Sequence, residues 1–117
     1  MLLALIVRTR PHRHRETRAE LDFALAAAAM DCKVEVYFMG SALLQLASGR
    51  DSEKALLPGG YAAWAAVPDL AETRFFADEG SLRRYRDSGL QWIHPVEGLD
   101  AAGMRKHWRR CDRVVVI

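Results

Sequence analysis

Apolar and polar positions along the chain follow two periods, one typical of strands and the other of helices. Residues 2–7 (LLALIV) are continuously apolar, which indicates a strand covered on both faces, as in a parallel sheet. Residues 33–39 alternate in character, so they predict a second strand whose Lys33, Glu35 and Tyr37 face is less deeply covered. Between them, an alanine-rich segment has the spacing of a helix from residue 16 or 17 to residue 30.

The remainder of the chain repeats this order of helix and strand. The predicted strands are residues 72–77, a weak one within 91–96 that Pro95 limits, and 113–117. The predicted helices are residues 42–47 with Ser41 as N-cap, about 60–67, 78–88 with Gly89 as the stop, and 100–110 with Asp100 as the cap. The closing run RVVVI has no polar tail after it, so we expect this strand to lie inside the sheet.

Five strands separated by helices define the fold class. They predict a three-layer α/β/α sandwich around a five-stranded, mainly parallel sheet, because right-handed crossovers place helices on both faces. At 117 residues the chain is expected to form a single domain over residues 1–117.

Composition excludes several classes of protein. The net charge of +2 is too small to argue for direct nucleic-acid binding. No apolar run approaches the roughly 20 residues that span a bilayer, and residues 1–7 lack the basic start and cleavage site of a signal peptide. Cys32 and Cys111 lack any Cys-x-x-Cys or metal-ligand spacing, so a reduced, cytoplasmic protein without a metal or cofactor is expected.

The segment of residues 8–18 is strongly basic, with five Arg and two His against one Glu. It follows the first predicted strand, at the carboxyl edge where open α/β sheets bind ligands. Two interpretations remain open. The segment is either a solvated loop or a docking surface for an anion, such as an acidic loop of a partner, a phosphate or RNA backbone. In the second case the candidate contacts are Arg10, His12, Arg13 and His14.

Several segments together resemble the DsrE/DsrF-like family, and within it the TusC/DsrF branch. The resemblance covers nearly the whole chain. It rests on Arg10-Pro11-His12, residues 18–22 (RAELD), 34–38 (VEVYF) followed by 43–46 (LLQL), and 111–117 (CDRVVVI).

This resemblance implies a compact α/β subunit of three-component hexamers that pass persulfide sulfur between proteins. The sulfur serves tRNA 2-thiouridine synthesis or dissimilatory sulfur oxidation. The implied partners are DsrE/TusD-type and DsrH/TusB-type subunits, and the resemblance also allows a homo-oligomer of the chain alone. The working cysteine usually belongs to the DsrE/TusD-type subunit, in the loop after the third strand, whereas the TusC/DsrF-type subunit is mostly architectural.

The chain departs from the reactive pattern in that loop. Residues 75–81 read FFADEGS around Ala77 and contain no cysteine, although a persulfide carrier needs a thiolate. We therefore expect a non-catalytic subunit, with subunit contacts from residues 56–67 and 42–46. The alternatives are a stand-alone sulfurtransferase that uses Cys32 or Cys111, and an anion- or nucleotide-binding module built on residues 8–18.

Overall fold

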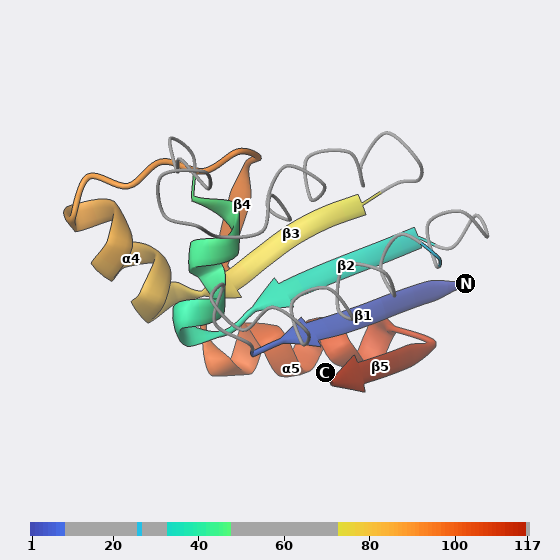
Figure 1. Cartoon of the computed structure of the whole chain (residues 1–117). Helices are drawn as coiled ribbons and strands as arrows, with labels where there is room; N and C mark the ends of the chain where they lie inside the picture. The colour runs from blue at the N-terminus through green and yellow to red at the C-terminus, as the bar shows by residue number, and fades with distance from the viewer. Residues whose placement is uncertain (9–25, 27–32, 48–72, 117) are drawn as a thin grey trace.

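The computed structural model describes residues 1–8, 26, 33–47 and 73–116, and it confirms an α/β fold around a parallel sheet. The sheet has five strands in the order β4-β3-β2-β1-β5, and all four neighbouring pairs are parallel (Figure 1). The strands are β1 (Leu2–Val7), β2 (Lys33–Phe38), β3 (Thr73–Asp78), β4 (Val96–Leu99) and β5 (Arg113–Val116).

Helices cover both faces of this sheet. On one face, α5 (Ala101–Arg110) packs Trp108 on a cluster of Ala4, Ile6, Tyr37 and Phe76. On the other face, the 3-10 helix η1 (Gly40–Leu46) and α4 (Glu79–Asp87) contribute to the larger cluster, which also holds Leu5, Val7, Val36, Phe38, Phe75 and Ala77. In the described part of the chain, no helix is long and apolar enough to cross a membrane.

Local capping explains where the described helices begin and end. The Asp78 carboxylate accepts a hydrogen bond from Ser81 N at 3.0 Å, and the Asp100 carboxylate accepts one from Gly103 N at 2.7 Å. Gly89 has φ +84°, a left-handed conformation that glycine adopts without a steric penalty. The predicted starts and stop of α4 and α5 are therefore confirmed.

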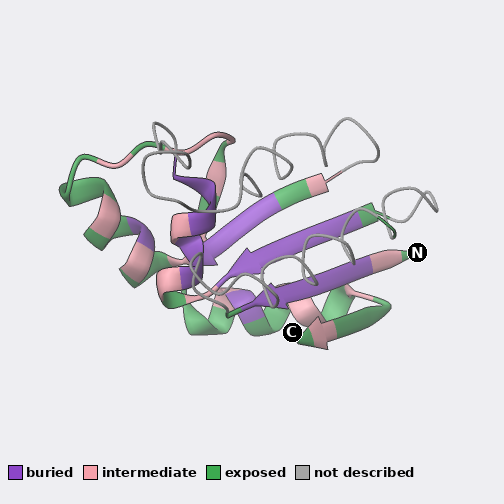
Figure 2. Cartoon of the chain, in the orientation of Figure 1, coloured by how far each residue is buried: buried purple, intermediate pink, exposed green. Residues whose placement is uncertain are grey.

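The strand β2 differs from its prediction. Glu35 is only 3% exposed and Tyr37 is fully buried, so the face expected to be less covered is exposed only at Lys33, where the strand begins (Figure 2). The reason is α5, whose Trp108 ring lies edge-on to Tyr37 with centroids 5.7 Å apart.

The strand β5 also differs from its prediction, because it lies at the edge of the sheet and not inside it. Its Val114 and Val116 are 43% and 51% exposed. β1 already pairs with β2 on its other side, so the strand that follows α5 takes the remaining free side of β1.

Two further predictions are corrected, one at Pro95 and one at Ser41. The strand predicted within residues 91–96 begins only at Val96, because proline has no N–H to donate to a ladder. Ser41 is not an N-cap: it lies inside η1, which begins after Met39 without a side-chain cap.

The helix η1 belongs to the core. Ala42, Leu43 and Leu46 are fully buried, whereas Leu44 is partly exposed, so most apolar side chains of residues 42–46 pack inside the chain. Of the predicted alanine-rich helix, only Ala26 is described, and it is helical. The predicted helix at 60–67 and the predicted contact segment 56–67 lie outside the described residues.

A close approach between β4 and α4 yields a test of this packing. A Cβ on Gly98 would lie 3.0 Å from Leu82 Cδ2 and 3.6 Å from Glu79 Cα. We expect Gly98→Val to lower the free energy of unfolding by about 1–3 kcal/mol, because the β-branched side chain overfills this contact. Urea denaturation measures the change.

Gly80→Ala is the comparison variant. A Cβ there would meet only Asp78 Oδ2, at an ordinary 3.8 Å, so replacing a helical glycine should raise stability by about 0.5–1 kcal/mol. Equal effects of the two substitutions would contradict the packing described for β4 and α4.

Candidate functional site

The carboxyl edge of the sheet carries a small pocket between α5 and the ends of β2, β3 and β4. Its volume is about 210 Å³. The lining is mostly apolar, with one acid and one base, and consists of Met39, Asp78, Leu99, Ala101, Met104, Arg105 and Trp108. This is the edge where open α/β sheets place their ligands.

Asp78 occupies the junction where the family resemblance implies a sulfur-carrying cysteine. Its carboxylate accepts hydrogen bonds from Gly40 N at 2.8 Å and from Ser81 N at 3.0 Å. Burial alone would raise the pKa of Asp78, but these hydrogen bonds outweigh it and hold the pKa below its ordinary value. β3 passes directly into α4 here, and Ala77 is fully buried. The junction is therefore a capped helix start without an intervening loop, and it contains no thiol.

A second group of polar residues lies under α5, around the buried Glu35. Arg110 Nη2 donates to both carboxylate oxygens of Glu35, at 2.8 and 3.0 Å, and Tyr37 Oη donates to Oε1 at 2.8 Å. His107 Nδ1 lies 3.2 Å from Arg110 Nη2 and 3.4 Å from Tyr37 Oη. The cluster therefore joins the middle strand of the sheet to the last turn of α5.

Within this cluster, the Glu35 carboxylate is ionised and the Tyr37 hydroxyl is protonated. Burial raises the pKa of Glu35, but hydrogen bonds from Arg110 and Tyr37 and the charge of Arg110 outweigh it, so the pKa lies below 4.5. Burial and the neighbouring Glu35 carboxylate raise the pKa of Tyr37, which stays a hydrogen-bond donor.

Cys111 ends α5 beside the same carboxylate. Its Sγ lies 3.7 Å from Glu35 Oε1 and 3.4 Å from the carbonyl oxygen of His107. Burial and the charge of Glu35 raise the pKa of the Cys111 thiol to about 11. The carboxyl end of a helix also disfavours a thiolate. Neighbouring cations such as Arg109 and Arg110 would favour a thiolate, but Arg110 is bound to Glu35, so the thiol stays protonated.

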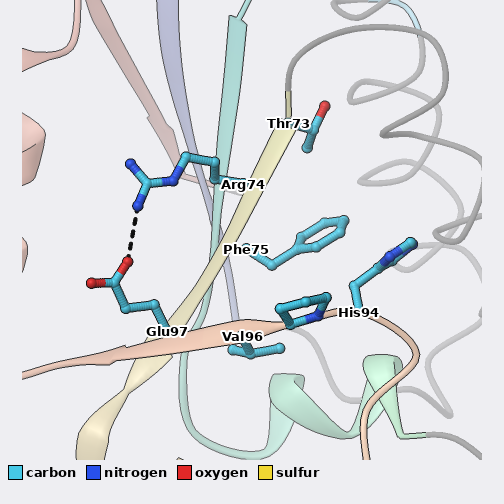
Figure 3. Close-up of a pocket in the computed structure, with 7 residues that line it drawn as sticks. Thr73, Arg74, Phe75, His94, Val96 and Glu97 are labelled. Atoms are coloured by element: carbon cyan, nitrogen blue, oxygen red, sulfur yellow. Dashed lines mark hydrogen bonds and ion pairs between the residues drawn. The ribbon is translucent and has the colours of Figure 1, made fainter.

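A third feature is a wider cleft of about 580 Å³ at the amino ends of β3 and β4 (Figure 3). Phe75 and His94 stack on one side of β3, with ring centroids 5.2 Å apart. Arg74 and Glu97 form an exposed ion pair at 3.0 Å on the other side. The described lining contains no thiol.

The structure describes only one of the candidate residues from the sequence. Cys111 is described, whereas Arg10, His12, Arg13, His14 and Cys32 lie outside the described residues. Among the described residues, no group of His, Cys, Asp and Glu side chains could hold a metal ion.

Sequence reasoning missed the cluster around Glu35. The signal was available, because a glutamate within a strand of a two-faced parallel sheet needs a countercharge. The position of the countercharge, at the end of the last predicted helix, cannot be read from the sequence because it depends on how that helix packs on the sheet.

The ion pair of Glu35 and Arg110 has a measurable pH dependence. Because the pKa of Glu35 is lowered in the folded state, its contribution to stability is present above about pH 4.5 and is lost as the pH falls through the folded-state pKa. Glu35→Gln should lower stability at pH 7 by about 2–3 kcal/mol, less than a fully buried pair because Arg110 is 47% exposed. The difference from wild type should shrink at pH 3. Chemical denaturation at both pH values measures it.

Glu97→Gln is the matched control, since its ion pair with Arg74 is more than half exposed on both sides. It should change stability by less than about 1 kcal/mol at either pH. A Glu35→Gln effect that is equally large at pH 3 and pH 7 would contradict an ionised Glu35.

Comparisons with known proteins agree with this fold. The crystal structure of the YchN protein from E. coli superposes with a TM-score of 0.78 at 13% sequence identity, covering 98% of this chain and 97% of that one. No curated protein sequence gives a significant match. The sequence profile of the DsrE/DsrF-like family matches residues 1–117, and the chain therefore belongs to the DsrE/DsrF-like family.

Proposed function

We propose that this chain is a TusC/DsrF-type, non-catalytic subunit of a sulfur-relay complex. The observation that carries the proposal is the junction of β3 and α4, where the Asp78 carboxylate binds Gly40 N and Ser81 N. A persulfide carrier of this family would need a thiol at that place.

The chemistry of persulfide transfer supports this interpretation. A carrier must attack a sulfane sulfur as a thiolate, and the fraction of thiolate falls as the pKa of the thiol rises. Cys111, with a pKa of about 11, is almost wholly protonated near neutral pH. Its sulfur is also only partly accessible and faces the Glu35 carboxylate.

The role left for the chain is assembly. In this proposal a DsrE/TusD-type subunit supplies the reactive cysteine, and a DsrH/TusB-type subunit completes the complex. The pathway is tRNA thiolation or dissimilatory sulfur oxidation, in the cytoplasm. Of the two contact segments expected from the sequence, residues 42–46 present Leu44 as a partly exposed apolar side chain, and residues 56–67 lie outside the described residues.

The first test concerns the thiols. After incubation with a small-molecule persulfide donor, intact-mass measurement should show no added sulfur atom on Cys111, because the thiol is protonated and half-buried. Cys32→Ser and Cys111→Ser variants assign any addition to one residue. Rapid addition of a single sulfur that is lost in one of these variants would instead favour a stand-alone sulfurtransferase.

The second test concerns assembly. Co-expression with DsrE/TusD-type and DsrH/TusB-type subunits from the same genome should yield a stable complex in size-exclusion chromatography and native mass spectrometry. The complex should persist when the carrier cysteine of the partner is replaced by serine, because assembly does not use the thiol. A chain that stays monomeric and binds neither subunit would overturn the proposal.

A further inference from the structure

The exposed side of α5 is uniformly basic. The helix sequence AAGMRKHWRR contains four Lys or Arg and no acid, and Arg105, Lys106, Arg109 and Arg110 are all exposed. Cations in the last turn suit the helix dipole, which accounts for Arg109 and Arg110. It does not account for Arg105 and Lys106, which lie in the middle of the helix.

Three of these four cations have no countercharge among the described residues. Arg110 is bound to Glu35, but Arg105, Lys106 and Arg109 make no ion pair or side-chain hydrogen bond within the described part of the chain. Arg105 and Arg109 are four residues apart, and like charges at this spacing destabilise a helix. The free chain therefore carries unfavourable repulsion along one helix face.

The mostly apolar pocket of about 210 Å³, whose polar lining is Arg105 and the hydrogen-bonded Asp78, opens beside this basic face. Ala101, Arg105 and Trp108 line it from α5, so the same helix supplies the pocket wall and the cations. The pocket is smaller than the roughly 300–1,000 Å³ of sites for drug-sized ligands. Its size suits one apolar side chain of a larger partner.

The indole N–H of Trp108, which also lines the pocket, is buried. Its buried Nε1–H has no hydrogen-bond acceptor in the described part of the chain. A buried donor without a partner is unfavourable by about 1–3 kcal/mol. Within the described part of the chain, the Trp108 ring is therefore held at the pocket wall by apolar packing and not by a hydrogen bond.

We infer that α5 and this pocket form a docking surface for an acidic segment of another protein, which inserts one apolar side chain between Leu99, Met104 and Trp108. Asp or Glu residues of that segment pair with Arg105 and Arg109. The inference goes beyond the sulfur-relay proposal, because it depends on charge and shape and not on thiol chemistry.

A protein segment fits this surface better than RNA does. RNA-binding surfaces usually present aromatic rings on which bases stack. The aromatic ring of α5, Trp108, is instead packed edge-on against Tyr37. An apolar pocket beside the cations favours a peptide with an anchor side chain.

The test pans a library of random peptides displayed on phage against the full chain. We expect selected peptides to combine several Asp or Glu residues with one Leu, Phe or Met. Binding of a synthetic selected peptide, measured by fluorescence anisotropy, should weaken about tenfold in Arg105→Glu/Arg109→Glu. It should also weaken as salt rises from about 0.05 M to about 0.5 M.

Two matched controls separate docking from folding. Ala101→Trp, which fills the mouth of the pocket, should weaken binding about tenfold, whereas Ala102→Trp on the neighbouring exposed position should not. Arg83→Glu/Arg86→Glu reverses two charges on α4 and should leave binding unchanged. Circular dichroism and thermal melts confirm that each variant is folded.

The inference is overturned by selected peptides without acids, by binding that the α5 variants leave unchanged, or by RNA binding at α5 without any peptide binding. None of these results bears on assembly with DsrE/TusD-type subunits. Conversely, a chain that fails to assemble with those subunits but binds acidic peptides at α5 would overturn only the sulfur-relay proposal.

Discussion

Glu35 lies on the central strand of the sheet, and its countercharge comes from Arg110 at the end of the last described helix. A carboxylate that is almost wholly buried must be paired or else become neutral, so the position of α5 follows from this one residue. With α5 fixed, Trp108 covers Tyr37, and β5 is directed to the free side of β1. Cys111 then meets the same carboxylate, which keeps its thiol protonated.

Much of the fold was predictable from local patterns. The starts of α4 and α5 follow from Asp78 and Asp100, and the apolar run of β1 correctly indicated a strand buried on both faces. These signals are local, because a cap or a strand period depends on residues only a few positions apart. The edge position of β5 was not predictable in this way, since its composition is that of an interior strand and its place depends on the path of α5.

The contacts of Asp78 and Glu35 were likewise not predictable from local sequence patterns. The sequence showed that residues 75–81 lack a cysteine, but it did not show that Asp78 joins Gly40 to the start of α4. Nor did it reveal the Glu35 cluster, whose members are up to 76 positions apart in the chain. Contacts of that kind are fixed by tertiary packing, and no single-sequence period encodes them.

The two hydrogen bonds that Asp78 accepts also affect which substitutions this position tolerates. Its carboxylate satisfies two backbone N–H groups, one from the turn after β2 and one from the first turn of α4. A mutation that placed a cysteine there would remove a helix cap worth about 0.5–2 kcal/mol together with the tie to Gly40. A thiol at this junction is therefore separated from the present sequence by a loss of stability. That loss of stability disfavours the appearance of a cysteine at this position.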